Sequence, residues 1–176
     1  MNTAHRTMKL LSKIVLLMGI GFITQAHSPK TSNTGYTDNT PPVTYKCLIQ
    51  MMNYTGERAY VVVSLIDPKG EYVKTLYVQG DDKEWFPDLK NWWKFSNGNE
   101  NIDAITGATI GNGQRNIISL SFDESQIDSG YTIRFESAVE NQEYFTIDAE
   151  VAVETSTIKN KVDGKGYIRH IRMMPN

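Results

Sequence analysis

The sequence predicts an all-β domain, an antiparallel β-sandwich of about seven strands into which one short aromatic helix is inserted. Three observations support this fold class. Short runs rich in Val, Ile, Tyr, Phe and Thr follow one another from residue 43 onwards, turn residues separate them, and only one segment has the apolar spacing of a helix. Short antiparallel strands of this number favour an immunoglobulin-like sandwich over a closed barrel.

The first 26 residues are expected to be a cleaved signal peptide. Arg6, Lys9 and Lys13 precede an apolar run at residues 14–23, and small residues stand before the expected cleavage after Ala26. The apolar run is short for a membrane span, and an uncleaved anchor is the alternative. Residues 27–42 are rich in Ser, Thr, Asn and Pro and are expected to form a flexible linker. The folded domain is therefore assigned to residues 43–176.

Seven segments have the composition of strands: 43–53, 58–66, 71–78, 115–122, 131–139, 143–154 and 166–174. The fullest alternation lies in the sixth, where the apolar residues are predicted to face the core and the polar ones to face water. The predicted inward residues are Phe145, Ile147, Ala149, Val151 and Val153, and the predicted outward ones are Thr146, Asp148, Glu150 and Glu154. Tight turns are expected at 67–70 and 128–130.

One segment departs from the β pattern. Residues 84–95 read EWFPDLKNWWKF, with Trp85, Leu89 and Trp92 at helical spacing and Pro87 placed where a first helical turn accepts it. We expect one short helix there. Its tryptophans are predicted to cover one end of the sandwich as an apolar plug, and the alternative is that Trp85, Trp92 or Trp93 flanks a flat ligand. The two interpretations are compatible.

The charge and the residue types limit which partners and which kinds of site the protein can have. The chain has 18 Lys and Arg against 20 Asp and Glu, and loss of the leader removes three positive charges, leaving about five net negative charges. Such a surface argues against nucleic acid and anionic lipid as partners. Cys47 has no partner for a disulfide and is expected to be buried, and His170 is expected to be a surface or hydrogen-bonded histidine. A zinc cluster and a hydrolase triad are not supported, so no catalytic or metal-binding residue is assigned.

A short motif follows the aromatic segment. It reads DAITGAT, ends at Thr109, and matches in full the pattern Asp-x-x-Ser/Thr-Gly-Ala-Thr. The pattern resembles the site at which a bacterial (ApbE-type) flavin transferase attaches flavin mononucleotide (FMN) through a phosphoester, as in flavin-carrying subunits of the sodium-pumping quinone reductase. The resemblance implies that Thr109 is the acceptor and that the transferase recognises Asp103 and Thr106. Gly107 and Ala108 add little bulk beside the acceptor.

The residue types in this motif suit the chemistry. The acceptor hydroxyl must reach a dinucleotide held inside another enzyme, so the flanking chain is expected to be thin, flexible and exposed. The alternative is a plain tight loop, in which Asp103 caps a turn and Gly107 takes a positive φ.

A second resemblance extends from about Tyr45 to the end of the chain. The segments GEYVKTL, LKNWW and ITGAT follow one another as in an exported bacterial family, domain of unknown function 2271 (DUF2271). The resemblance implies a periplasmic protein associated with a flavin transferase and with a PepSY-type or other inner-membrane protein that passes electrons across the membrane.

Two function classes follow. The leading hypothesis is an exported electron carrier, rather than an independent enzyme, that holds covalent FMN at Thr109 near Trp92 or Trp93. The alternative is a non-enzymatic periplasmic sandwich that binds a partner protein or a small ligand, with the TGAT loop purely structural.

Overall fold

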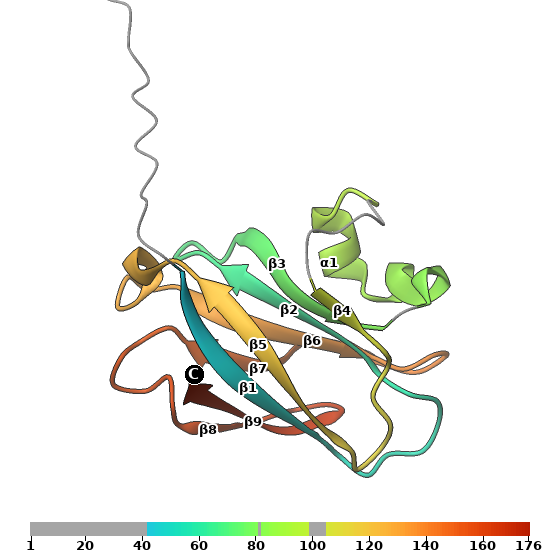
Figure 1. Cartoon of the computed structure of the whole chain (residues 1–176). Coiled ribbons are helices and arrows are strands. Elements are labelled where there is room, and N and C mark those ends of the chain that lie inside the picture. The colour runs from blue at the N-terminus through green and yellow to red at the C-terminus, as the bar shows by residue number, and fades with distance from the viewer. Residues whose placement is uncertain (1–41, 81, 99–104) are drawn as a thin grey trace, which may run out of the picture. The chain divides into compact units, whose positions relative to one another are not determined.

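The computed structural model describes residues 42–80, 82–98 and 105–176, and these form an all-β sandwich (Figure 1). The predicted signal peptide and nearly all of the predicted linker lie outside these residues. One sheet has the order β5 (Arg115–Phe122), β1 (Val43–Met51), β9 (Ile168–Pro175) and β8 (Lys161–Asp163). The other has the order β4 (Ile105–Gly107), β3 (Tyr72–Gln79), β2 (Tyr60–Ile66), β6 (Thr132–Ala138) and β7 (Tyr144–Ala152). The predicted fold class is confirmed.

All seven predicted strands are present, but two more strands bring the number in the described residues to nine. The additional strands, β4 and β8, have three residues each. β4 also departs from the antiparallel prediction, because it runs parallel to β3 at the sheet edge. β4 contains part of the TGAT motif, so the motif is partly incorporated into the sandwich.

Strand β2 explains how the layers are arranged. All seven of its residues are buried, whereas β5, for example, alternates between buried and exposed positions. Val61, Val63 and Leu65 pack into the core between the two sheets. Tyr60 and Val62 belong to a second apolar cluster with residues of the helical segment. A strand covered on both faces reads as a nearly continuous apolar run, and YVVVSLI fits this except at Ser64, which is buried as well.

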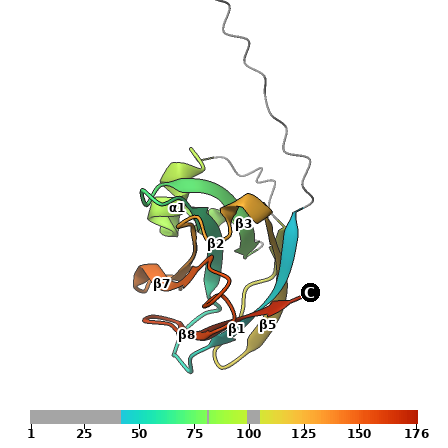
Figure 2. The same cartoon turned by 90° about the vertical axis from the view of Figure 1, so that its left-hand side faces the viewer.

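The predicted helix is present as two pieces. A 3-10 helix η1 (Lys83–Asp88) is followed by the α-helix α1 (Lys90–Phe95). They meet at Leu89, whose ψ of 61° is outside the helical range. Pro87 lies inside η1, supplies no N–H, and disfavours the α conformation for the residue before it. Together η1 and α1, called the helical insertion below, cover the face of the five-stranded sheet that is turned away from β1 (Figure 2).

The prediction for strand β7 was partly wrong. Asp148, predicted to face water, is completely buried, and Ile147, predicted to face the core, is 37% exposed. The pairing of β6 with β7 changes register here, since Phe135 lies opposite Ala149 while Ser137 lies opposite Phe145. This irregularity adds residues to β7 and interrupts the alternation of side chains between the two faces.

The two predicted tight turns are present. The Asp67 side chain accepts hydrogen bonds from the backbone N–H groups of Lys69 and Glu71, at 2.8 and 2.9 Å. Gly70, in the same turn, has a positive φ of 87° that favours glycine. In the second turn, Asp128 and Gly130 have positive φ values of 55° and 80°.

Candidate functional site

The described part of the DAITGAT motif is anchored on both sides of Ala108 and Thr109. On one side, the Gly80 N–H donates to the carbonyl of Gly107 at 2.6 Å, continuing the pairing of β3 with β4. On the other side, Ala59 and Ile110 exchange two backbone hydrogen bonds of 2.9 and 3.2 Å. Between these points Ala108 is exposed and Thr109 is half-buried. The chain around Thr109 is thus thin and accessible, but it is held by hydrogen bonds on each side.

Gly107 is required for a different reason from the one the tight-loop interpretation gave. It is not among the glycines with positive φ. A Cβ atom at this position would lie 2.3 Å from the hydroxyl oxygen of Tyr77, a side chain that is itself buried. The absence of a side chain therefore lets β4 approach β3 closely.

Thr109 lines a small depression of about 140 Å³ that also involves Arg58 and Trp85. The Arg58 guanidinium donates from Nη1 to the backbone carbonyl of Thr109 at 3.2 Å. The other residues around the depression are Glu57, Tyr60 and Glu140. A threonine, an arginine and a tryptophan therefore lie around one depression, and Glu57 and Glu140 make its lining mixed in charge. Guanidinium groups pair well with phosphate oxygens, so the depression has the chemistry to hold a phosphate ester at Thr109.

The three tryptophans have different environments. Trp92 is completely buried, its Nε1 donates to Thr75 Oγ1 at 2.9 Å, and Phe86 packs against it edge to face. Trp92 thus packs as an apolar plug, but the plug covers the outer face of the five-stranded sheet and not the predicted end of the sandwich. Trp92 has no exposed ring face to offer a ligand. Trp93 is half-buried and packs near Phe86, with ring centroids 6.4 Å apart. Trp85, also half-buried, is the tryptophan that shares the depression with Thr109.

The structure describes little of the two residues that the transferase is expected to recognise. Asp103 lies outside the described residues, and only the backbone of Thr106 is described, paired with Val78 of β3. Arg58 was not singled out by the sequence. It lies far from the motif along the chain, and only the pairing of Ala59 with Ile110 brings it there.

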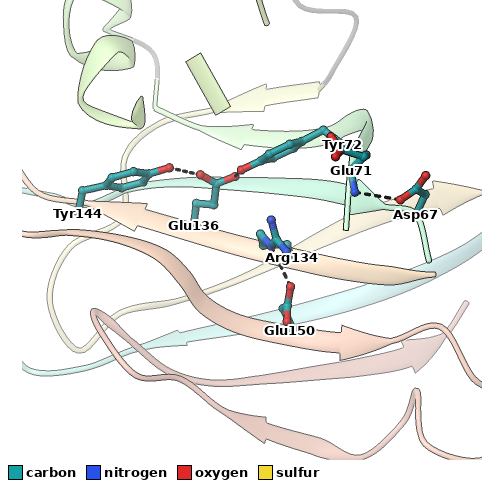
Figure 3. Close-up of polar contacts among 7 residues, drawn as sticks. All are labelled: Asp67, Glu71, Tyr72, Arg134, Glu136, Tyr144 and Glu150. Atoms are coloured by element: carbon teal, nitrogen blue, oxygen red, sulfur yellow. Dashed lines mark hydrogen bonds and ion pairs between the residues drawn. The ribbon is translucent and has the colours of Figure 1, made fainter. Parts of the chain in front are cut away.

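A second polar cluster, also missed from the sequence, lies beneath the helical insertion (Figure 3). Glu136 of β6 is completely buried and accepts hydrogen bonds from the hydroxyls of Tyr72, at 2.7 Å, and Tyr144. Its pKa is raised by burial, and hydrogen bonds from both tyrosines and from the Trp92 backbone oppose that rise. The Tyr144 hydroxyl also accepts the Asn91 N–H at 3.1 Å.

These contacts explain how α1 is attached to the sheet. The first backbone N–H groups of a helix have no partner inside the helix, and Leu89 at the N-cap provides no side-chain hydrogen bond. Tyr144 and Glu136 supply acceptors for the N–H groups of Asn91 and Trp92. Beside them, Arg134 pairs with Glu150 at 2.8 Å and lies over the ring of Tyr72. The cluster thus supports the helical insertion.

Cys47 and His170, the other two residues considered as reactive groups, lie on strands of the four-stranded sheet. Cys47 is buried as predicted, and burial raises the pKa of its thiol to about 12, so it is a poor nucleophile. His170 is half-buried on β9, opposite Gln50. Within the described residues, there is no group of three or more His, Cys, Asp and Glu side chains placed to hold a metal ion. None of the helices described is both long and apolar enough to cross a membrane.

Comparison with known proteins identifies the family. Residues 42–170 match the family described as "Predicted periplasmic protein (DUF2271)". Among curated proteins and solved structures, none matches this sequence. The family match covers the five-stranded sheet, the helical insertion, the segment that contains Thr109, and the four-stranded sheet up to the start of β9. The chain therefore belongs to the DUF2271 family of predicted periplasmic proteins.

Proposed function

We propose that this protein is an exported electron carrier whose FMN is attached covalently to Thr109 by a flavin transferase. The observation that carries the proposal is the position of Thr109: it ends a complete DAITGAT motif and shares a depression with Arg58 and Trp85. The family's description as periplasmic agrees with a site of action outside the cytoplasm.

The attachment is a phosphoryl transfer from flavin adenine dinucleotide bound in the transferase. The Thr109 Oγ1 forms a bond to the phosphorus atom on the riboflavin side of the pyrophosphate. The bond between that phosphorus and the bridging oxygen breaks, and adenosine monophosphate leaves with this oxygen. A base of the transferase takes the hydroxyl proton. No oxidant or reductant is needed in this step.

The residues around Thr109 fit a phosphoester. Arg58 is already within hydrogen-bonding distance of the Thr109 carbonyl, so its guanidinium can neutralise a phosphate beside the side chain of the same residue. Exposed Ala108 leaves room on the side by which a second protein must approach. Glu57 and Glu140 also line the depression, and their carboxylates would repel the phosphate unless Arg58 neutralises its charge. Arg58 is therefore expected to matter more for the modified protein than for the unmodified one.

The bound flavin would supply the ability to accept and release electrons, which no side chain of this protein provides. The protein's own residues would fix the tether at Thr109, hold its charge and limit the access of water. The electron partners expected are a membrane protein of the PepSY type, or another inner-membrane electron-transfer protein.

One observation favours the alternative function, a sandwich that binds a partner protein or a small ligand without flavin. The close approach of Gly107 to Tyr77 gives the motif a structural reason to contain glycine. The structural reason applies to Gly107, however, and leaves the hydroxyl of Thr109 without a role.

Intact-protein mass spectrometry separates the two functions. The protein would be co-expressed with its transferase and exported, together with Thr109→Ala and Thr106→Ala. We expect the wild type to gain the mass of one FMN less one water, Thr109→Ala to gain nothing, and Thr106→Ala to be modified less completely. Thr44→Ala, a change to a half-buried threonine of β1 whose hydroxyl forms a hydrogen bond with that of Ser121, serves as the matched control and should be modified like the wild type. An unmodified wild type would favour the partner-binding function.

A further inference from the structure

A groove separate from the depression at Thr109 lies between the helical insertion and the turn that joins β6 to β7. It has a volume of about 320 Å³. Trp85 and Lys90 line it from the helical insertion, and Gln142, Glu143 and Tyr144 line it from the turn and the start of β7. With Asp88 and Asn141, which also line it, the groove has two aromatic residues, one cation, two amides and two carboxylates at its surface.

Trp85 belongs both to this groove and to the depression at Thr109. The turn makes a second connection, because Glu140 lines the depression and the next residue, Asn141, lines the groove. The depression at Thr109 and the groove are therefore neighbours, and Trp85 lies between them.

The groove is held in shape by contacts that do not involve a ligand. Gln142 donates from Nε2 to the carbonyl of Thr55 at 2.9 Å, and the hydroxyl of Tyr144 is bound to Glu136 and to the Asn91 N–H. A preformed site of this kind, with aromatic side chains and a few placed polar groups, suits a flat heteroaromatic ring that also forms hydrogen bonds.

Another depression is larger, at about 370 Å³, but its position is unsuitable. It is lined by Tyr72 and Phe95, and Tyr72 begins β3, whereas Gln79 at the other end of β3 pairs with Gly107. Seven strand residues separate these positions by about 23 Å, which is beyond a ribityl phosphate tether.

We infer that the groove between Trp85 and Tyr144 holds the isoalloxazine ring of the flavin, with Trp85 in contact with the ring. This inference rests on the proposed attachment of FMN to Thr109. It replaces the earlier expectation of a ring near Trp92 or Trp93, since Trp92 is buried and Trp93 lines neither the groove nor the depression at Thr109.

The test uses the emission of the flavin itself. An indole in contact with isoalloxazine quenches its fluorescence, because the indole donates an electron to the excited ring. The exported, flavinylated protein would be compared with its own proteolytic digest, in which the flavinyl peptide is free. Trp85→Leu removes the proposed contact, and Trp93→Leu is the matched control, a half-buried tryptophan in the same helical insertion. Intact mass gives the extent of modification for each variant.

We expect wild-type emission to be several-fold weaker than that of its digest. Trp85→Leu should be clearly brighter than the wild type but dimmer than the digest, because Tyr144 also lines the groove and a phenol quenches flavin too, and Trp93→Leu should remain as quenched as the wild type. A modified wild type as bright as its digest, or a Trp85→Leu variant as quenched as the wild type, would overturn the ring placement alone. An unmodified wild-type mass would overturn the attachment at Thr109 and the ring placement with it. If Trp85→Leu is not flavinylated, the emission of Trp85→Phe, and that of the wild type relative to its digest, still test the ring placement.

Discussion

At the scale of single residues, Asp148 holds the segment between β8 and β9. Its carboxylate accepts hydrogen bonds from the backbone N–H groups of Lys165, Gly166 and Ile168, at 2.9, 2.7 and 2.9 Å. The Ser137 hydroxyl donates to it as well. The acid is thus fully satisfied in the interior, which is how a buried carboxylate persists without being catalytic.

Asp148→Ala should lower the free energy of unfolding by about 3 kcal/mol, because it leaves the buried N–H group of Ile168 and the partly buried ones of Lys165 and Gly166 without their acceptor. Urea denaturation checks this value. Glu150→Ala, on the same strand, is the control: its partner Arg134 is only partly buried, so the loss should be about 1 kcal/mol or less. Equal losses for the two variants would mean that the contacts of Asp148 do not stabilise the fold.

Trp92→Ala should cost about 3–5 kcal/mol in unfolding free energy, as expected for removing a large, completely buried side chain. The change also leaves Thr75 Oγ1 without its indole donor. Trp93→Ala should cost less, since Trp93 is only half-buried. A loss below about 1 kcal/mol for Trp92→Ala would contradict the plug.

At the scale of elements, the helical insertion depends on a buried acid from the sheet. Glu136, Tyr72 and Tyr144 come from β6, β3 and β7 and meet beneath α1 (Figure 3). The aromatic spacing of residues 84–95 predicted a helix, but it could not predict this attachment, which requires three strands to be in register. It also could not predict the interruption at Leu89, which Pro87 and its neighbours impose locally.

Glu136→Gln should change how stability varies with pH. Burial raises the carboxyl pKa above its ordinary 4.5, so the folded state keeps the proton to higher pH than the unfolded chain does. This contribution to stability is fully present below pH 4.5 and is lost as pH rises through the folded pKa. Relative to the wild type, Glu136→Gln should therefore gain stability as pH rises from about 4.5 towards neutrality.

Thermal unfolding of both proteins across this pH range provides the check. Tyr72, Tyr144 and Arg134 are the other ionisable groups facing Glu136, and the tyrosines have pKa values raised above 10, chiefly by burial, so they do not titrate there. A stability difference that stays constant with pH would show that Glu136 has an ordinary pKa in the folded protein.

At the scale of the whole molecule, local patterns predicted the strands and their sandwich, because period-two alternation follows from one buried face. They could not predict β4 and β8, which have three residues each and exist through their partners β3 and β9. The same limit applies to the site. The motif indicated Thr109, whereas Arg58 and Trp85 became neighbours only through pairing between distant segments.

The exported protein is expected to begin at His27. The charged start, the short apolar run and the small residues before His27 favour cleavage after Ala26. N-terminal sequencing of protein recovered from the extracytoplasmic fraction measures this directly. A mature form that still begins at Met1 would indicate an uncleaved anchor.

The central claim, FMN on Thr109, is tested most directly by locating the modification in a peptide. Trypsin is expected to cut after Lys94 and Arg115, releasing residues 95–115, which contain Thr106, Thr109 and Ser96 as the hydroxyl-bearing residues. Fragmentation of this peptide, from wild-type protein exported with its transferase, should place the added FMN on Thr109. An unmodified peptide, or FMN on Thr106 or Ser96, would contradict the claim.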